Sequence, residues 1–144
     1  MKNFLITLFW KQNKHHKHSV LIHTLKVVYH CFKRKNYKMI PTAFLHDIGK
    51  PFVAYQKEED KINNEYSFTN HEEKSYQIIK NIPFISKYTK DLVRYHYLIR
   101  KIDKSREKND FNDLNKCLKI WNNLDENFKK DLKEFQICDD LGKK

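Results

Sequence analysis

Glycine and proline are scarce in this sequence. Only two of its 144 residues are glycine and three are proline, whereas an average usage of about 7% glycine predicts about ten glycines. β-Sandwiches and barrels need many turn residues, so this scarcity argues against them. The two glycines, Gly49 and Gly142, both fall within motifs described below.

Long apolar runs are also missing. No stretch approaches the ~18 apolar residues that a membrane span needs, and the mean hydropathy is −0.84. The apolar segment 4–10 lacks a small-residue cleavage site and leads into a basic segment with His15, His16 and His18, unlike a signal peptide. We expect residues 1–17 to form an N-terminal helix and this basic, histidine-rich segment. We also expect a cytoplasmic protein with no membrane partner.

The three cysteines are few and far apart. Cys31, Cys117 and Cys138 form no Cys-x-x-Cys pair, which argues against a zinc ribbon or a redox motif. Reduced, partly buried thiols in a cytosolic protein are the simplest interpretation.

Positive charge is what the sequence has in excess. Lysine and arginine total 29 against 18 acids, which gives a formal net charge of +11. Such an excess favours anionic partners, including nucleic acids. Only four of these cations are arginine, the residue suited to bidentate recognition of phosphates and bases. Charge by itself therefore leaves a nucleic-acid partner as an alternative.

The apolar pattern is helical nearly throughout. It predicts helices over residues 19–33, 39–48, 70–80, 89–101, 112–121 and 126–139, with a loop at 56–70 and a loop or frayed end at 103–110. Ser19 is the expected first N-cap, Thr69 and Glu72 form a capping-box signature, and Gly49 should end the helix before it. We predict one all-α domain over residues 1–144, a compact unit of about six to seven helices.

A His-Asp pair ends one of the most apolar runs. His46 and Asp47 follow the apolar residues 43–45 and come just before Gly49. A buried carboxylate costs several kcal/mol unless it is paired, so Asp47 needs a metal, a cation or a set of donors. The simpler alternative is a helix-end pair between Asp47 and Lys50.

A second aspartate continues an apolar stripe on the last helix. The stripe follows steps of four and three residues, through Phe128, Leu132 and Phe135, and these steps place its members on one face. Asp139 is next on this face and should point inward, whereas Asp140 falls on the solvated side. An acid at a helix C-terminus opposes the helix dipole, so Asp139 needs a compensating cation; otherwise both are frayed tail residues.

Three histidines on other predicted helices complete a set. Each of His23, His71 and His96 is, singly, more simply a packed or capping residue. Together with the aspartates they give one ionisable residue from each of five helices, plus one neighbour: His23, His46, Asp47, His71, His96 and Asp139. Imidazole and carboxylate ligands suit borderline divalent metals, and a helical bundle can gather inward-facing ligands into one site.

At these residues the chain resembles the HD-domain superfamily of metal-dependent phosphohydrolases, whose pattern is a histidine, a His-Asp doublet and a distant aspartate. His23 lies in Leu-Ile-His-Thr-Leu, the doublet in Leu-His-Asp-Ile-Gly-Lys-Pro at 45–51, and Asp139 in Asp-Asp-Leu-Gly. The resemblance covers about residues 18–142. It is closest to the HD module of bacterial CCA-adding tRNA nucleotidyltransferases, whose later Gly-His-Glu is represented by Asn-His-Glu at 70–72.

The resemblance implies an HD-like fold that holds one or two divalent ions of manganese, iron, cobalt, nickel, zinc or magnesium. One ion is expected on His23, His46, Asp47 and Asp139. In members with two ions, Asp47 would bridge, and His71 and His96 would complete the second site. A metal-activated water would attack a phosphate ester. Asp47 and Lys50 are the expected catalytic residues, and the substrate phosphate is expected to meet Lys50, Arg94 and Arg100.

The expected activity is that of a phosphohydrolase or phosphodiesterase on nucleotides, cyclic phosphates or RNA ends. The partner is then a phosphorylated small molecule or an RNA end. A non-catalytic, basic nucleic-acid-binding module with a vestigial or structural metal site is the alternative. A regulatory interaction protein that uses the 56–70 loop is a third reading, and the sequence carries no signal for an oligomeric state.

Overall fold

A computed structural model describes residues 19–144, so the predictions for residues 4–10 and for His15, His16 and His18 lie outside the described residues. The regular secondary structure of the described part is helical, and an isolated bridge joins Tyr55 and Ser67. Its elements are α2 (Val20–Lys33), the 3₁₀ turn η1 (Tyr37–Met39), α3 (Ile40–Leu45), α4 (Lys50–Val53), α5 (Glu58–Ile62), α6 (His71–Ile79), α7 (Lys87–Tyr95), α8 (Leu98–Glu107), α9 (Phe111–Asn122) and α10 (Glu126–Gly142).

The prediction of an all-α domain is confirmed. Within residues 19–144, six helices have nine residues or more, in line with the expected number. None of the helices in this range is long and apolar enough to cross a membrane. Ser19 caps α2 as predicted, because its side chain accepts a hydrogen bond from the Ile22 backbone N–H.

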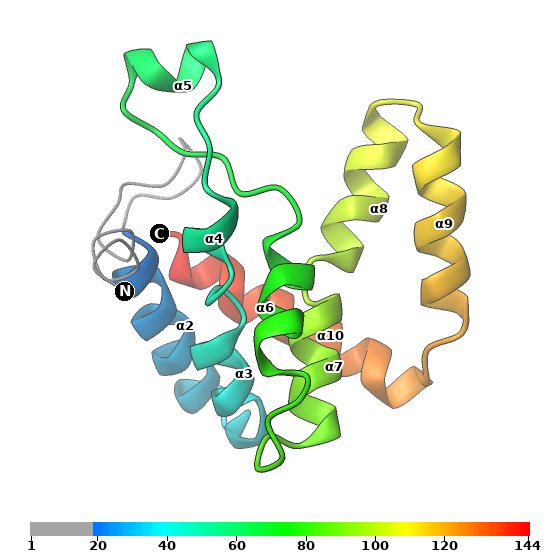
Figure 1. Ribbon diagram of the computed structural model, residues 1–144. Helices are drawn as coiled ribbons and strands as arrows, with labels where there is room; N and C mark the ends of the chain where they lie inside the picture. The colour runs from blue at the N-terminus through cyan, green and yellow to red at the C-terminus, as the bar shows by residue number, and fades with distance from the viewer. Residues whose placement is uncertain (1–18) are drawn as a thin grey trace.

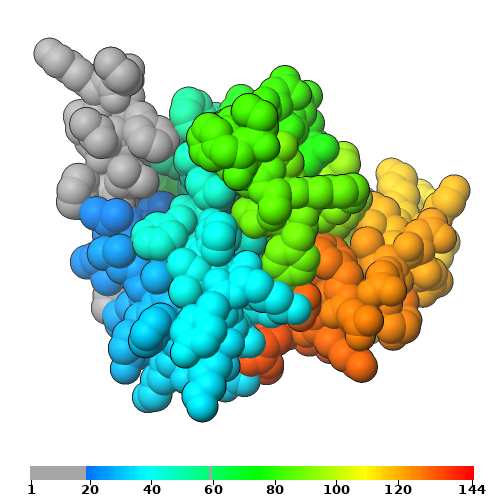
Figure 2. Space-filling view, turned by 90° about the horizontal axis from the view of Figure 1, so that it is seen from below, coloured from blue at the N-terminus to red at the C-terminus, as the bar shows by residue number. Residues whose placement is uncertain are grey.

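The helices form a bundle from which two projections rise on the same side (Figure 1). α2 packs against α10 and α3, α6 packs against α7 and α4, and α8 packs against α9. The two projections are the hairpin of α8 and α9 and the segment that carries α5, and they stand at opposite edges of this end of the bundle. The opposite end, seen from below, is formed by the region of α3, the connection between α6 and α7, and the start of α10 (Figure 2).

Two apolar cores of unequal size hold this arrangement together. The larger joins α2, η1, α3, α7 and α10 and consists of Val27, Cys31, Met39, Ala43, Leu92, Leu132, Phe135 and Cys138. The smaller lies between α8 and α9 and consists of Leu98, Ile102 and Cys117. The bundle is therefore anchored by far more buried apolar surface than the α8–α9 hairpin.

Both glycines are sites of close backbone approach. A Cβ atom at Gly49 would lie 2.5 Å from the backbone oxygen of His71 and 2.5 Å from the backbone nitrogen of Ser75, and one at Gly142 would lie 2.6 Å from Val27 Cγ2. Only glycine leaves room for these contacts. Gly49 thus lets α6 pack on the turn at 46–49, and Gly142 lets the end of α10 pack on α2.

The predicted helix 89–101 is wrong, because the chain forms α7 and α8 with a break at His96 and Tyr97. His96 Nδ1 donates a hydrogen bond to the Val93 carbonyl at 2.7 Å. In a continuous helix this carbonyl would accept from the Tyr97 N–H. The imidazole competes for that acceptor, and a side-chain competition of this kind leaves no mark on the hydrophobic period.

Other element boundaries also need correction. Asn70, in a left-handed conformation and without a side-chain cap bond, is the N-cap of α6, so the predicted capping box does not form. The predicted loop 56–70 contains α5, and residues 103–107 belong to α8. The helix before Gly49 ends earlier, at Leu45, and the last helix continues to Gly142. Most of these corrections concern one or two turns at the end of an element or a short polar segment, where periodicity gives little information.

Candidate metal centre

Six buried ionisable side chains meet where the helices of the bundle converge. His23 comes from α2, the His46–Asp47 pair from the turn after α3, and His71 from the first residue of α6. His96 comes from the break between α7 and α8, and Asp139 from the last turns of α10. Each of the six is 6% exposed or less. We call them the histidine–aspartate cluster, and its members are all six candidate metal ligands of the sequence.

Four members of the cluster form a first ligand group, defined as His23, His46, Asp47 and Asp139. His23 Nε2 lies 2.9 Å from Asp139 Oδ1 and 3.5 Å from Asp47 Oδ2. His46 Nε2 lies 3.2 Å from Asp47 Oδ2, 3.7 Å from Asp139 Oδ1 and 3.4 Å from His23 Nε2. One ligand atom each from His23, His46 and Asp47 lies within 4.8 Å of the others, and Asp139 joins them through its contacts with the two imidazoles.

Three members form a second ligand group, defined as Asp47, His71 and His96. One ligand atom from each lies within 4.8 Å of the others, and His71 Nε2 is 3.3 Å from Asp47 Oδ1. Asp47 belongs to both groups, with Oδ2 toward the first and Oδ1 toward the second. A single carboxylate is thus placed to bridge two ligand sets.

Helix ends and backbone carbonyls orient three of the four imidazoles. His46, His71 and His96 each have Nδ1 hydrogen-bonded to the carbonyl three residues earlier, at 2.8, 2.9 and 2.7 Å. A carbonyl only accepts, so Nδ1 must carry the proton and Nε2 keeps its lone pair when the ring is neutral. Metal-ligating histidines are commonly held in this way by a bond from the other ring nitrogen.

The spacing of the donor atoms fits a metal ion. Bonds of about 2.0–2.2 Å to imidazole nitrogen and carboxylate oxygen place neighbouring ligand atoms roughly 3.0–3.5 Å apart. The first group spans 2.9–3.7 Å, and the measured contact in the second is 3.3 Å. Nitrogen and oxygen donors of this kind suit borderline divalent cations such as manganese, iron, cobalt, nickel or zinc.

Cations compensate both carboxylates of the cluster. Lys50 Nζ lies 2.7 Å from Asp47 Oδ2, and Lys50 is itself buried. Arg100 Nη2 donates to Asp139 Oδ2 at 2.8 Å and to Asp140 Oδ1 at 2.7 Å. Asp139 points inward and Asp140 is far more exposed, as the helical face predicted. The compensating cation that Asp139 needs is therefore supplied by another helix.

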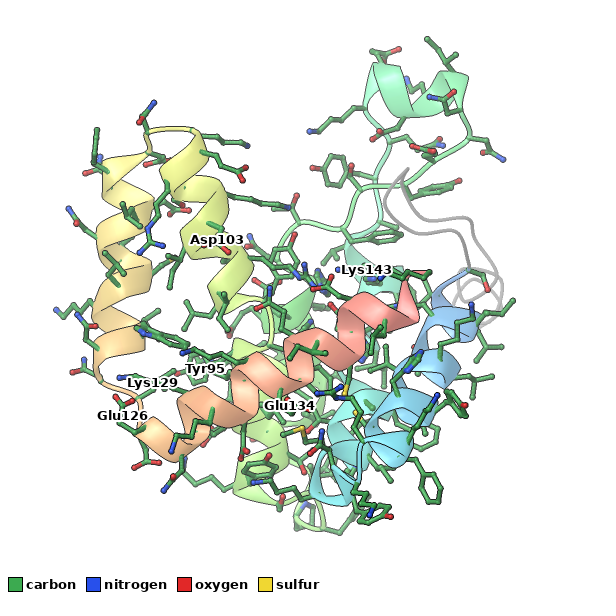
Figure 3. All side chains as sticks on the ribbon, turned by 180° about the vertical axis from the view of Figure 1, so that it is seen from behind. Tyr95, Asp103, Glu126, Lys129, Glu134 and Lys143 are labelled. Atoms are coloured by element: carbon green, nitrogen blue, oxygen red, sulfur yellow. The ribbon has the colours of Figure 1, made fainter. Side chains whose placement is uncertain are left out.

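The end of α10 supplies a further cation. Lys143 Nζ lies 3.3 Å from Asp139 Oδ2, and Figure 3 places Lys143 at the C-terminal end of α10, far from Glu126 and Lys129 at its other end. The structure does not bring Arg94 to the cluster. Its Nε donates to Glu73 at 3.0 Å, and its guanidinium lies 4.5 Å from the centre of the Tyr76 ring.

Burial and neighbouring charges set the protonation of the cluster. Burial lowers the pKa of His71, and burial together with the nearby His46 and His71 lowers the pKa of His96 well below its ordinary value. Burial also acts to lower the pKa of His46, but Asp47 outweighs it, so that pKa is raised. His71 and His96 are thus neutral and ready to bind metal at neutral pH.

Both aspartates are ionised. Burial acts to raise the pKa of Asp47, but His46 and Lys50 outweigh it and hold that pKa well below its ordinary value. At Asp139 burial is likewise outweighed, by the hydrogen bond from His23 and by the charge of Lys143, so its pKa is also well below the usual range. The cluster therefore offers negative charge to a cation without needing to release a proton from either carboxyl.

The cluster opens on one side into a cavity of about 1010 Å³. Asp47, His71, His96 and Asp139 line it, whereas His23 and His46 lie beneath. Its walls come from the segment 55–71, from α8 and from the end of α10, which is the side from which both projections rise (Figure 1). Under the imidazoles lies Phe135, whose ring centre is 5.6 Å from that of His46 and 6.2 Å from that of His96.

Sequence reasoning missed the residues that support the ligands. Ser75 Oγ accepts a hydrogen bond from the Gly49 N–H at 2.9 Å and donates one to the His46 carbonyl at 2.7 Å, so it fixes the turn that carries the His-Asp pair. Buried Glu72 is ion-paired with Lys101. The only signal for Ser75 was its place one helical turn after His71, on the same face of α6.

Comparison with known protein families agrees with the geometry. The family model of the HD domain matches residues 20–127, which is more than half of the chain. The protein therefore belongs to the HD domain family, whose members are generally metal-dependent hydrolases. The matched region ends before Asp139, so the place of that residue in the cluster is established by the structure. Comparisons with curated proteins and with solved structures found no match.

Proposed function

We propose that this protein is a metal-dependent phosphohydrolase that cleaves phosphodiesters or cyclic phosphates of the nucleotide type, including those at RNA ends. The observation that carries the proposal is the shared carboxylate of Asp47, which faces both ligand groups. Two adjacent ligand sets favour a diester, because attacking and leaving oxygens can both be held. The sequence likeness to the HD module of CCA-adding enzymes supports the same substrate class.

The chain's own residues prepare the cluster for this reaction. Divalent ions, when bound, would activate water for attack and polarise the phosphoryl group. Asp47 and Asp139 hold negative charge, and the carbonyl bonds of His46, His71 and His96 keep each Nε2 directed inward. Lys50 and Arg100 bring positive charge to the wall of the cavity beside the cluster, where a phosphate would bind.

The cavity is consistent with a substrate larger than inorganic phosphate. Its volume of about 1010 Å³ lies at the upper end of the range of about 300–1,000 Å³ for small-molecule sites. Aromatic side chains of Tyr55, Phe68 and Tyr97 line it together with lysines. A nucleoside phosphate can place its base against the aromatic residues and its phosphate near the cluster.

The test measures metal content and hydrolysis together, for the wild type and for Asp47→Asn. After manganese loading and desalting, metal per chain is determined by elemental analysis, and turnover is followed with bis(p-nitrophenyl) phosphate and 2′,3′-cyclic nucleotides. We expect Asp47→Asn to lose metal and to lower turnover about 10³-fold or more, since Lewis-acid stabilisation is worth several kcal/mol.

Asp91→Asn is the matched control, because within residues 19–144 the one ion pair of Asp91 is with Lys87 on the outer surface of α7. This variant should keep both metal and turnover. Circular dichroism checks that Asp47→Asn retains its helices. Wild-type turnover in a folded Asp47→Asn protein would refute the proposal. Metal-independent binding of nucleic acid without any hydrolysis would favour the non-catalytic module instead.

A further inference from the structure

One stripe of side chains on α8 leads away from the cluster along the cavity. Tyr97, Lys101, Lys104 and Lys108 follow steps of four, three and four residues, the spacing of one helix face. Lys101 and Lys104 lie within α8, and Tyr97 and Lys108 are its N-cap and C-cap. All four line the cavity. At 1.5 Å per residue the stripe is about 16 Å long. We call these four residues the α8 stripe.

The stripe begins at the second ligand group. The ring centre of Tyr97 lies 5.3 Å from that of His71 and 6.3 Å from that of His96. Lys101 follows one turn later, where its ammonium is bound to Glu72 and to the Asn70 side chain. A molecule that lies along the stripe therefore has one end at the bridged part of the cluster.

The outer part of the stripe consists of two exposed lysines, Lys104 and Lys108. Within residues 19–144, no carboxylate lies in ion-pair distance of Lys104 or Lys108, and the Lys104 ammonium contacts the Tyr97 hydroxyl and ring. Four acids also line this part of the cavity. Asp103 and Glu107 lie on a neighbouring face of α8, with Asp103 3.7 Å from Arg106, and Asp110 and Asp113 lie at the start of α9.

The opposite wall offers aromatic rings. Tyr55 and Phe68 line the cavity from the segment that carries α5. The Tyr55 hydroxyl is bonded to Thr69 Oγ1 at 2.8 Å, and its backbone is bridged to Ser67. Lys50 Nζ lies 5.5 Å from the centre of the Phe68 ring. A lysine track with aromatic faces nearby is the combination that binds single-stranded nucleic acids without strong sequence preference.

We propose that the cavity binds the terminal few nucleotides of a single-stranded nucleic acid, with the phosphates along the α8 stripe and the strand end at the cluster. The length of the stripe exceeds what one nucleotide needs, and Lys104 and Lys108, one helical turn apart, are placed for successive phosphates rather than for a single one. Only the cleavage of that end rests on the function proposed above, because binding along the stripe requires no metal.

The experiment measures binding without metal. Fluorescein-labelled octauridylate and octathymidylate are titrated by fluorescence anisotropy in EDTA over a series of salt concentrations, beside labelled UMP and an abasic octamer. The wild type should bind the octamers far more tightly than UMP and than the abasic strand. Equal binding of the two octamers indicates recognition of phosphates and bases, and tighter binding of octauridylate adds a contact to the 2′-hydroxyl.

The double variant Lys104→Gln/Lys108→Gln tests the stripe. It should lower the slope of log affinity against log salt by about 1.4, at about 0.7 per lost phosphate contact, and weaken octamer binding about tenfold at 50 mM salt. Lys119→Gln/Lys130→Gln removes the same charge from exposed lysines that do not line the cavity. This control should leave the slope and the affinity close to the wild type.

The outcomes separate this inference from the proposed function. Octamer binding that is no tighter than UMP binding, or that falls equally in both double variants, overturns the proposed role of the α8 stripe. This holds even if bis(p-nitrophenyl) phosphate is hydrolysed. Octamer binding that the stripe variant alone weakens supports it, even in a protein that hydrolyses nothing. Equal binding of the abasic strand would overturn the role of the aromatic wall and with it the assignment to nucleic acid.

Discussion

The two ligand groups share Asp47 but differ in charge and in position. The first group adds a second carboxylate, Asp139, and its histidines lie beneath the cavity surface on elements that the larger core fixes. The second group adds only the imidazoles of His71 and His96, which line the cavity. A cation would thus be held by two negative charges in the first group and by one shared charge in the second.

This difference predicts that the two groups bind a metal ion with different affinities and have different roles toward the substrate. The more negative and more deeply placed group should bind its ion more tightly, because opposite charges interact strongly where water is scarce. The second group, which faces the cavity and adjoins Tyr97, should hold its ion more weakly and meet the substrate. Removal of one group at a time should therefore have unequal consequences.

The largest expected effect comes from Asp139→Asn compared with His71→Asn. Asp139→Asn removes the charge that only the first group has, so the tighter ion should be lost and affinity should fall 100-fold or more, on the order of 3 kcal/mol. His71→Asn should remove only the weaker ion. Calorimetric titration of the metal-free proteins with manganese measures both. Equal losses of manganese affinity in the two variants would contradict the expected difference between the two ligand groups.

A smaller effect is expected from Gly49→Ala, which acts on the turn that both groups share. The added Cβ meets backbone atoms of His71 and Ser75, so α6 must move, at a cost of about 1–3 kcal/mol in the free energy of unfolding. Gly142→Ala meets chiefly a methyl group of Val27 and should cost less. Urea unfolding measures stability, and both metal affinities should weaken together in Gly49→Ala.

The smallest effect is a dependence of stability on pH in the metal-free protein. The pKa of His96 is lowered on folding, so below about pH 6.5 the unfolded state binds more protons and stability falls as pH falls. The pKa of His46 is raised, so its contribution has the opposite sign. Each proton taken up corresponds to about 1.4 kcal/mol per pH unit.

Two variants check these signs against each other. His96→Gln should make the loss of stability between pH 7.5 and 5.5 shallower, whereas His46→Gln should make it steeper. Urea unfolding in EDTA at the two pH values gives the slopes, which are independent of any constant cost of the substitutions. The same direction of change in both variants would show that folding does not shift the pKa values of His46 and His96 in opposite directions.

The sequence could predict those features that depend on helical faces. The inward direction of Asp139 followed from its spacing to Phe135, and the six ligand candidates followed from ionisable residues at positions where apolar ones are expected. The boundaries at His96 and Asn70 could not be predicted. There a side chain competes for a backbone carbonyl or the backbone is left-handed, and neither changes the apolar period.

The sequence by itself therefore determined an all-α chain, the six candidate ligands and the need of Asp139 for a cation, because helical periodicity is a property of local spacing. Only the tertiary structure decided that the two oxygens of Asp47 face different groups, that Arg100 reaches Asp139 while Arg94 turns to Glu73, and that a lysine stripe meets the cluster. These facts depend on how helices distant in sequence approach one another, and the close contacts at the two glycines allow that approach for α6 and α10.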